Sequence, residues 1–161
     1  MVAEHVEALI TDFFMTITQA DTNNLNGLAI LFDDYRVFYK QDSNINQAKT
    51  FLLERLKNKD SVIYIAYIDD AAVGFTQLYP LFSSVAMQPI YLLNDLYVDA
   101  NHRGKGIGEA LINKAKQLCI DKNNKGLAIQ TAFDNPAQDL YQRLGFAKDS
   151  DLHFFWKQQN V

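Results

Sequence analysis

Apolar residues recur along this chain with two periods, and the change from one period to the other predicts the order of its elements. In the first half we expect a strand, two helices and two further strands, over residues 13–19, 21–39, 45–58, 61–68 and 73–81. Asp21 or Thr22 is placed to cap the first helix. Asp69 and Asp70 form a turn signal between the last two strands, which predicts a hairpin.

The second half continues with a loop at 82–84 and five further elements. They are a strand ending at Val98, a helix from Ile107, a strand at 127–133, a short helix at 136–144 and a last strand at 152–157. Gly145 directly follows the short helix, where glycine commonly ends a helix. The chain is therefore expected to combine strands and helices along its whole length.

Alternation in the strand that ends at Val98 divides its side chains between two faces, unless a bulge intervenes. One face would carry Leu93, Asp95 and Tyr97, and the other Leu92, Asn94, Leu96 and Val98. Asp95 is thus a carboxylate within an otherwise apolar strand. Burial would raise the pKa of such a carboxyl toward a value that suits a base.

Composition agrees with one compact domain. A chain of 161 residues with 48% hydrophobic content predicts a single domain over residues 1–161, with residues 1–10 as a flexible arm. The net charge of −4 argues against a nucleic-acid partner and favours a cationic amine. Neither a signal peptide nor a long apolar span is recognisable, so we expect a cytoplasmic protein with no membrane partner.

Several other residues are not expected to take part in catalysis or metal binding. The single cysteine, Cys119, excludes an internal disulfide and falls on the apolar stripe of its helix. The histidines have no ligand spacing with it, so no metal site is expected. Asp33 and Asp34 are interpreted as a solvated helix face, and Phe38 as a core residue.

A basic, glycine-spaced loop precedes the helix that begins at Ile107. Gly104, Gly106 and Gly108 would let backbone N–H groups approach an anion, while Arg103 and Lys105 add positive charge. No hydroxyl follows the lysine, which disfavours a P-loop, and the glycine spacing differs from a Rossmann fingerprint. The loop therefore predicts a site for the phosphate or pyrophosphate of a ligand other than those bound by P-loop and Rossmann proteins.

Two motifs together carry a family resemblance. Arg103, Gly106 and Gly108 meet the pattern Arg-x-x-Gly-x-Gly, which resembles the acetyl-CoA pyrophosphate loop of the GCN5-related N-acetyltransferase (GNAT) superfamily. The later segment from Asn135 to Phe146 resembles that family's second motif, an Asn followed by a helix ending Leu-Tyr-x-x-x-Gly-Phe. Its alanine and tyrosine come one residue earlier than in the common form.

The resemblance implies a fold and a co-substrate. The expected fold is α/β (α+β), with a mixed, mostly antiparallel central sheet flanked by about four helices. In that family the sheet splays between the strands that here end at Val98 and cover 127–133, and acetyl-CoA lies in the gap. The implied co-substrate is acetyl-CoA, with no metal.

The resemblance also implies which residues would act. The cofactor-binding set is Leu96, Tyr97, Val98, Arg103, Gly104, Lys105, Gly106, Ile107, Gly108, Glu109, Asn135 and Tyr141. Tyr141 would stand beside the thioester sulfur and donate a proton to it. The alternative interpretation is that Tyr141 is only a core residue of a short helix. A backbone N–H near Tyr97 or Val98 would stabilise the oxyanion.

The base and the acceptor site are argued from chemistry. An aliphatic amine with a pKa of about 10.4 must lose a proton before it attacks. Either Asp95 or a chain of water molecules would take that proton, and Asp95 could instead be a buried structural carboxylate. The expected substrate-binding residues are Tyr35, Tyr39, Gln77, Tyr79 and Asp95, whose aromatic and acidic groups suit an ammonium.

The resulting hypothesis is an acetyl-CoA-dependent N-acetyltransferase that works by direct attack in a ternary complex. A small polyamine or an amino-acid-like metabolite is the favoured acceptor, and a protein lysine or N-terminus is the next. A catalytically silent acyl-CoA-binding module and a nucleotide-binding protein remain as alternatives. A homodimer through edge strands or the C-terminal aromatics at 153–156 stays open.

Overall fold

The computed structural model describes residues 14–158. The chain divides into two compact units, one up to Gln130 and the other from Thr131, and each is described by itself. The expected arm at 1–10 and the start of the first strand at Phe13 lie outside the described residues. The expectation of one domain over the whole chain stays a prediction.

The first unit contains five strands, three α-helices and two 3₁₀ turns among its described residues. In chain order they are β1 (Met15–Gln19), η1 (Thr22–Asn24), α1 (Leu25–Phe38), α2 (Ile45–Asn58), β2 (Val62–Ile68), β3 (Ala71–Ser83), β4 (Gln88–Val98), η2 (Ala100–His102), α3 (Ile107–Asp121) and β5 (Leu127–Ile129). This order confirms the prediction, with differences in length: α1 begins at Leu25 instead of residue 21, and β3 begins at Ala71 instead of residue 73. β3 continues through the expected loop to Ser83, and β5 ends at Ile129 instead of residue 133.

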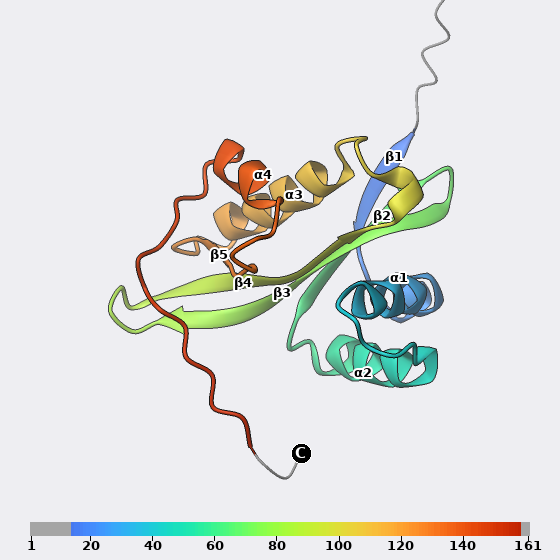
Figure 1. The fold of residues 1–161 in the computed structure, drawn as a ribbon, viewed down its shortest axis with the longest axis horizontal. Coiled ribbons are helices and arrows are strands. Elements are labelled where there is room, and N and C mark those ends of the chain that lie inside the picture. Colours follow the sequence, from blue (N-terminus) through green and yellow to red (C-terminus); the bar gives the residue numbers. More distant parts are fainter. Residues whose placement is uncertain (1–13, 159–161) are drawn as a thin grey trace, which may run out of the picture. The chain divides into compact units, whose positions relative to one another are not determined.

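The strands form one sheet in the order β1-β2-β3-β4-β5. Neighbouring strands are antiparallel except β4 and β5, which are parallel. Helices α1 and α2 lie side by side on one face of the sheet, and α3 lies on the other face (Figure 1). A mixed, mostly antiparallel sheet between helices is the predicted architecture.

The core between the sheet and α1 and α2 is built from aliphatic and aromatic side chains. Phe75 of β3 is fully buried, and its ring centroid lies 6.0 Å from that of Phe32 on α1. Phe32 in turn stacks on Phe51 of α2 at 5.5 Å. Burying each such ring contributes about 2–3 kcal/mol, so these contacts fix both helices on the sheet.

The helical segment starts at the predicted cap. The Asp21 carboxylate accepts a hydrogen bond from the Asn23 N–H at 2.7 Å, and the Asn24 side chain accepts from the Asp21 N–H at 2.9 Å. Such a reciprocal capping box satisfies N–H groups that have no intrahelical acceptor. It covers a 3₁₀ turn, after which α1 proper begins at Leu25.

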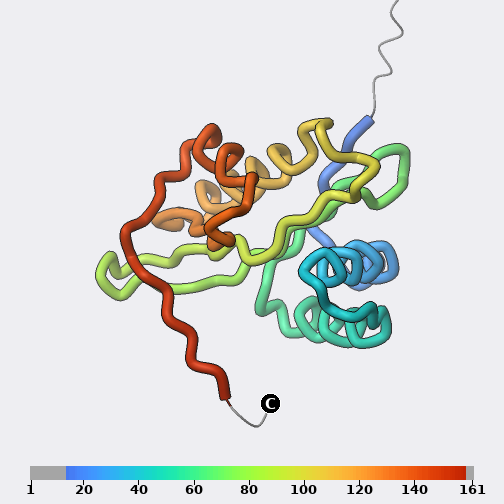
Figure 2. The backbone as a smooth tube through the Cα atoms, in the orientation of Figure 1, coloured from blue at the N-terminus to red at the C-terminus, as the bar shows by residue number. Residues whose placement is uncertain are grey.

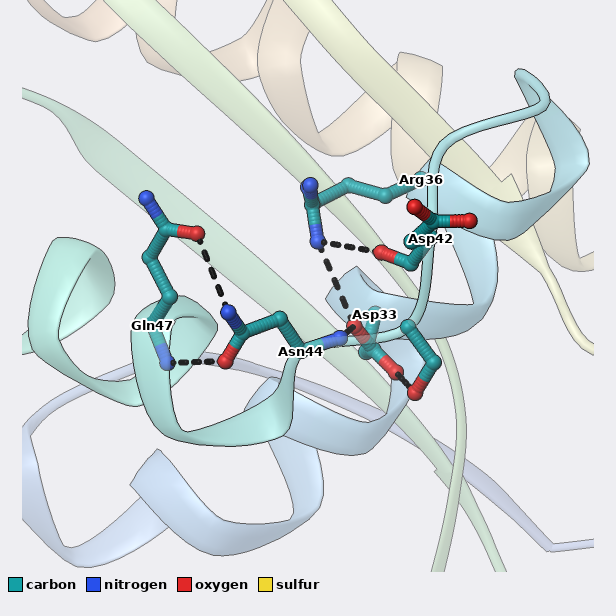
Figure 3. Close-up of polar contacts among 6 residues, drawn as sticks. Asp33, Arg36, Asp42, Asn44 and Gln47 are labelled. Atoms are coloured by element: carbon teal, nitrogen blue, oxygen red, sulfur yellow. Dashed lines mark hydrogen bonds and ion pairs between the residues drawn. The ribbon is translucent and has the colours of Figure 1, made fainter.

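Asp33 corrects the expectation of a solvated acidic pair, because its side chain is buried. Its carboxylate accepts hydrogen bonds from the Ser43 hydroxyl at 2.5 Å and the Asn44 N–H at 2.7 Å (Figure 3). Arg36 contributes an ion pair at 3.4 Å. These partners, led by Ser43, hold the pKa of Asp33 below its ordinary value despite burial. The carboxylate thereby ties the link between α1 and α2 to the end of α1.

A bulge in β4 changes the expected division of its faces. Gln77 of β3 pairs with Asp95, but the next residue, Leu78, pairs with Leu93, so Asn94 is an extra residue in β4. An extra residue reverses the alternation that follows it. Leu93 therefore faces α3, while Asp95 shares the α1 face with Tyr97, which packs against the core under that helix.

β3 and β4 extend as a ribbon beyond Leu78, the last residue of β3 that pairs with β2, so this part of β3 is an outer edge, while β4 still pairs with β5 at Tyr91–Leu93 (Figure 2). Pro80 lies opposite Tyr91, whose N–H donates away from β3 to the Gly126 carbonyl. Residues opposite each other in an antiparallel pair both face inward or both face outward. Pro80 therefore turns its missing N–H to the outer edge of β3. Pro89 does the same on the outer edge of β4, where its carbonyl accepts from Lys125.

The second unit contains one short helix, α4 (Gln138–Arg143), among its described residues. The helix ends in a Schellman motif: Gly145 has φ +88°, its N–H donates to the Gln142 carbonyl, and the Phe146 N–H donates to the Tyr141 carbonyl. The prediction of a last strand at 152–157 was wrong, since the described residues there form no ladder. A sequence that favours a strand forms one only where another backbone segment accepts and donates its hydrogen bonds.

No helix within residues 14–158 is long and apolar enough to cross a membrane.

Candidate active site

The glycine-spaced loop leads directly into α3, as predicted. Gly104 and Gly106 have φ values of +75° and +77°, a region that side chains other than glycine rarely adopt. Gly106 is the N-cap of α3, and no side chain caps this end of the helix. The first N–H groups of an α-helix have no intrahelical acceptor and carry the positive end of the helix dipole. This terminus therefore presents anion-binding groups, with no side chain covering them as a cap.

Gly74 brings this helix close to the sheet. A Cβ at Gly74 would lie 2.9 Å from the Tyr97 carbonyl oxygen and 3.3 Å from Ile107 in the first turn of α3. Any side chain here would push the helix off the strands. The sequence reasoning missed this residue, although an isolated glycine within a strand pattern is a signal of close approach.

The edge of β4 beside the loop has backbone groups that β5 does not reach. β5 pairs only with Tyr91–Leu93, so the sheet opens after the bulge, where splaying was predicted. Phe75 lies opposite Tyr97 and Gly74 opposite Val98. With the reversed alternation, the polar groups of Tyr97 face β3, and those of Leu96 and Val98 face the open edge. Of the two predicted oxyanion donors, only the Val98 N–H has the required direction.

The turn after β4 is fixed by Asp99. The Asp99 N–H donates to the Val73 carbonyl at 2.9 Å, and its carboxylate accepts from the Asn101 N–H at 3.1 Å. The same carboxylate contacts the Nδ1 of His102 at 2.7 Å. These bonds hold the 3₁₀ turn η2 and so set where the glycine loop begins.

Arg103 contacts groups on both β4 and α1. Its Nε donates to the Val98 carbonyl at 3.0 Å. Its guanidinium carbon lies 5.5 Å from the ring centroid of Phe38 and 5.6 Å from that of Tyr97. The expected forked contact of Arg103 with a phosphate stays a prediction.

Asp95 is buried on the α1 face, in keeping with its predicted place in an apolar strand. Burial raises the pKa of Asp95, while hydrogen bonds from Asn94 and Tyr35 act in the opposite direction. The Asn94 amide donates to one carboxylate oxygen at 3.1 Å. The Thr76 hydroxyl donates to the Asp95 carbonyl at 2.8 Å and fixes the backbone there. The bulge therefore supplies both the position of this carboxylate and one of its partners.

Gln77 and Tyr79 lie beside Asp95, as the prediction of an acceptor site requires. Gln77 is directly opposite Asp95 and fully buried; its amide nitrogen donates to Ser61 at 3.1 Å, and its amide oxygen has no hydrogen-bond partner within the described residues. Burial raises the pKa of Tyr79 to about 12, and the nearby charge of Asp95 adds to this rise. Ser61 was not singled out from the sequence.

Aromatic side chains continue this site toward the end of α1. Tyr35 contacts Tyr39 at 5.0 Å and Tyr97 at 6.2 Å between ring centroids. Tyr39 in turn contacts Phe38 at 5.3 Å. The expectation of Phe38 as a core residue was wrong, because 59% of it is exposed. Its position at the last turn of α1 carries it past the sheet, over Arg103.

In the second unit, Asn135 and Tyr141 belong to one local structure. The Asn135 side chain donates to the Thr131 hydroxyl at 2.7 Å and accepts from the Ala137 N–H at 2.9 Å. The Tyr141 ring meets the Phe146 ring at 6.3 Å across the Schellman motif. The motif thus fixes the position of Tyr141 at the end of α4.

Chemically, the first unit combines an anion-binding loop, an open strand edge and a buried carboxylate flanked by tyrosines. Cys119 is buried, its pKa is raised by burial, and it lies on α3 away from these groups. Within the described part of the chain, no three His, Cys, Asp or Glu side chains are arranged to hold a metal ion.

Comparison with known proteins gives a consistent result. The family model described as acetyltransferase (GNAT) family matches residues 28–146. An uncharacterized N-acetyltransferase of Bacillus subtilis, YhfO, is 44% identical over 137 residues, which cover 84% of this chain and 92% of that protein.

Solved structures agree in fold. The crystal structure of a probable acetyltransferase superposes with a TM-score of 0.84 and 36% identity, covering 91% of this chain and 99% of the other. An aminoglycoside N-acetyltransferase, AAC(6')-Iy, in complex with CoA has a TM-score of 0.78 and 21% identity, covering 94% of this chain and 99% of the other.

Proposed function

The chain belongs to the acetyltransferase (GNAT) family and is an acetyl-CoA-dependent acyltransferase, and on this premise we propose that it acetylates a primary amine by direct attack in a ternary complex. The favoured acceptor is a small polyamine or an amino-acid-like metabolite. The observation that carries the proposal is the junction of an uncapped, glycine-spaced helix terminus with an open strand edge and a buried carboxylate.

The pyrophosphate of acetyl-CoA is proposed to bind at the N-terminus of α3. Backbone N–H groups from Gly104 to Gly108 would donate to its oxygens, and Lys105 would add charge. The absence of a side-chain cap supports this assignment. A Cβ at Gly104 or Gly106 would meet nothing within 4 Å, so these glycines are explained by their backbone conformation and not by crowding within the chain.

The open edge of β4 would stabilise the reacting carbonyl. The N–H groups of Leu96 and Val98 face this edge, and an amide N–H there can donate to the oxygen that becomes negative as the amine attacks. Such preorganised donors usually make the largest single contribution to acyl transfer. The carbonyl of Val98 at the same edge accepts from Arg103.

Asp95 is proposed as the base that takes the amine proton. Its pKa is raised by burial, which brings a carboxylate closer to the value a base needs at neutral pH. The unpaired amide oxygen of Gln77 and the hydroxyls of Tyr35 and Tyr79 would bind the amine N–H groups. A chain of water molecules ending at the same carboxylate is the alternative route for the proton.

Tyr141 is proposed to return a proton to the thiolate that leaves. A phenol with a pKa of about 10 can protonate a thiolate whose conjugate acid has a pKa of about 8.5. Asn135 is proposed to bind the pantetheine part of the co-substrate. Support for both comes from the family motif and from the Schellman motif that fixes the tyrosine at the end of α4.

Aromatic groups near the acceptor site favour a compact cationic amine. Tyr35 and Tyr39 lie edge to face, and their rings can attract an ammonium group before it reaches Asp95. The net charge of −4 adds a weak general attraction for cations. A flat surface for a protein substrate has no comparable support, so protein lysines and N-termini rank second.

The first experiment is calorimetric titration of the purified chain with acetyl-CoA, with ATP and NAD as controls. We expect micromolar binding of acetyl-CoA and none of the two nucleotides. Thiol release is then measured with panels of polyamines, amino acids and lysine peptides. Binding without release on any amine would favour a silent acyl-CoA-binding module, and no binding at all would contradict the proposal.

A further inference from the structure

The side chain of Arg103 adds a contact between the last turn of α1 and the end of β4, next to the Tyr35–Tyr97 ring contact that also joins these elements. It belongs to the loop after η2, yet it lies over Phe38, the last residue of α1. It also lies over Tyr97 and donates to the Val98 carbonyl at the end of β4.

These contacts use the particular chemistry of arginine. A guanidinium is flat, so it can lie on aromatic faces while its N–H groups donate within its own plane. A lysine keeps the charge but has neither the flat surface nor the Nε donor. Phe38 gains a partner in this way although 59% of it is exposed. This contact gives a physical reason for an aromatic residue at an exposed helix end.

The contacts also hold the open edge of β4. The peptide group between Val98 and Asp99 is bonded at both ends, since its carbonyl accepts from Arg103 and its N–H donates to Val73. A peptide plane held at both ends cannot rotate. The Val98 N–H, which the proposed function assigns to the reacting carbonyl, belongs to the preceding peptide group, which shares the Val98 Cα with this fixed plane.

We infer that Arg103 is a positioning residue that fastens the last turn of α1 to the end of β4, so that the aromatic wall of the acceptor site and the open strand edge are held as one unit. The part of this inference that concerns the acceptor site rests on the proposed function. The mechanical link between α1 and β4 does not.

Hydrogen exchange measures this link directly, without a substrate. The N–H groups of Tyr39, Lys40 and Gln41 donate to carbonyls in the last turn of α1, so their exchange reports on fraying of this turn. We expect Arg103→Lys and Phe38→Leu each to speed exchange there about threefold, the loss of one exposed cation–π contact. The double variant should be no faster than either single variant.

A matched control is available in α2. Arg55 lies over the ring of Phe51 at 5.1 Å, so Arg55→Lys removes the same kind of contact elsewhere and should leave residues 39–41 unchanged. Unchanged exchange at 39–41 in Arg103→Lys would overturn the inference. Faster exchange over the whole chain would also overturn it, because that would show a general loss of stability.

Coenzyme A is the probe for the coupling between the two sites. At saturation it should slow exchange at 39–41 in the unchanged chain and not in Arg103→Lys. Faster exchange on adding coenzyme A would show that Arg103 leaves Phe38 for a phosphate, and this would overturn the positioning role. If coenzyme A does not bind at all, the proposed function fails, while the ligand-free comparison still decides the role of Arg103.

Discussion

Gln77 and Asp95 lie directly opposite each other on β3 and β4, and both side chains are buried. The extra residue Asn94 precedes Asp95, so Asp95 shares a face with Gln77 and Tyr97 while Leu93 lies on the opposite face. A carboxylate and an unpaired amide oxygen in such a place weaken the fold, since each lacks the solvation it has in water. Buried polar groups that lower the stability of the fold are typical of active sites.

Replacing Asp95 by Asn tests whether this carboxylate lowers the stability of the fold and is needed for activity. We expect kcat/KM to fall by about 10²- to 10³-fold, the usual effect of losing a positioned base. The unchanged enzyme should gain activity as pH rises through the pKa of Asp95, and Asp95→Asn should lack that rise. The measurement is a pH–rate profile with the amine that the screen identifies. Full activity in the variant would instead support a water chain without this carboxylate.

The same variant should have the opposite effect on stability. Burial raises the pKa of Asp95 in the folded state above its unfolded value. The folded protein therefore binds more protons between these two values, and the buried charge weakens the fold at higher pH. We expect Asp95→Asn to unfold at a higher temperature than the unchanged chain at pH 8, and the difference to shrink toward pH 4. A lower unfolding temperature at pH 8 would show that the carboxylate supports the fold.

Replacing Tyr141 by Phe removes a hydroxyl and keeps the ring that contacts Phe146. We expect kcat to fall by about 10²-fold, because the thiolate then leaves without a proton donor. The affinity for acetyl-CoA, measured by calorimetry, should change less than twofold. Tyr64→Phe is the control, since Tyr64 is buried in β2, outside the proposed site. Equal turnover in both variants would exclude the acid role.

Among the described residues, four glycines have open space where a Cβ would be, and three of them have positive φ. Gly104, Gly106 and Gly145 have positive φ, and Gly126 does not. Gly106→Ala should cost about 1 kcal/mol from backbone strain and weaken acetyl-CoA binding severalfold. Gly126→Ala should change neither thermal unfolding nor affinity. Equal behaviour of the two variants would contradict a conformational role for the loop glycine.

Asp33 is expected to make the free energy of unfolding depend on pH in the acidic range. Its pKa is lowered by Ser43 and its other partners, so its contribution is present above the unfolded value near pH 4 and is lost as pH falls through the folded value. We expect Asp33→Asn to lower the free energy of unfolding at pH 7 by about 2 kcal/mol. Denaturant unfolding of the variant measures this, and the difference should shrink as pH falls below the unfolded value.

The neighbouring residue provides the control for this prediction. Burial and the charges of Asp33 and Asp99 raise the pKa of Asp34, so its ionised form is disfavoured in the folded state. Asp34→Asn should therefore leave stability unchanged or increase it at pH 7. A loss of stability equal to that of Asp33→Asn would mean that the hydrogen bonds at the link are not the cause.

Local patterns in the sequence were sufficient for much of the fold. Helix α2 spans Ile45–Asn58 as predicted, because its apolar period and its cap are both encoded within those residues and Asn44. The glycine loop ahead of α3 was predicted for the same reason. Backbone conformation and helix start are properties of a few consecutive residues.

The errors concern relationships between distant residues. The burial of Asp33 depends on a hydroxyl and an N–H some ten residues further along, which periodicity does not reveal. Residues 152–157 have strand composition, but a strand exists only where another backbone pairs with it. The contact of Phe38 with Arg103 joins the end of a helix to a loop far along the chain, and no local pattern relates the two.

The sequence predicted which segments contain the site residues, and it did not predict how these residues face one another. Asp95 and Gln77 were singled out for their residue types, and the register of β3 and β4 then placed them face to face. The direction of the Val98 N–H required knowledge of the bulge. A one-residue insertion in a strand leaves no mark in composition, yet it reverses every position that follows it.

The ribbon formed by the ends of β3 and β4 carries exposed apolar residues, among them Phe82, Val85 and Met87. Such a ribbon would ordinarily invite strand-by-strand growth into aggregates. Pro80 removes an N–H from the outward edge of β3, and on the β4 side the Pro89 carbonyl already accepts from the Lys125 N–H. An approaching strand therefore meets a missing donor on one side and an occupied acceptor on the other. We therefore expect these edges to oppose strand-by-strand addition at the apolar tip.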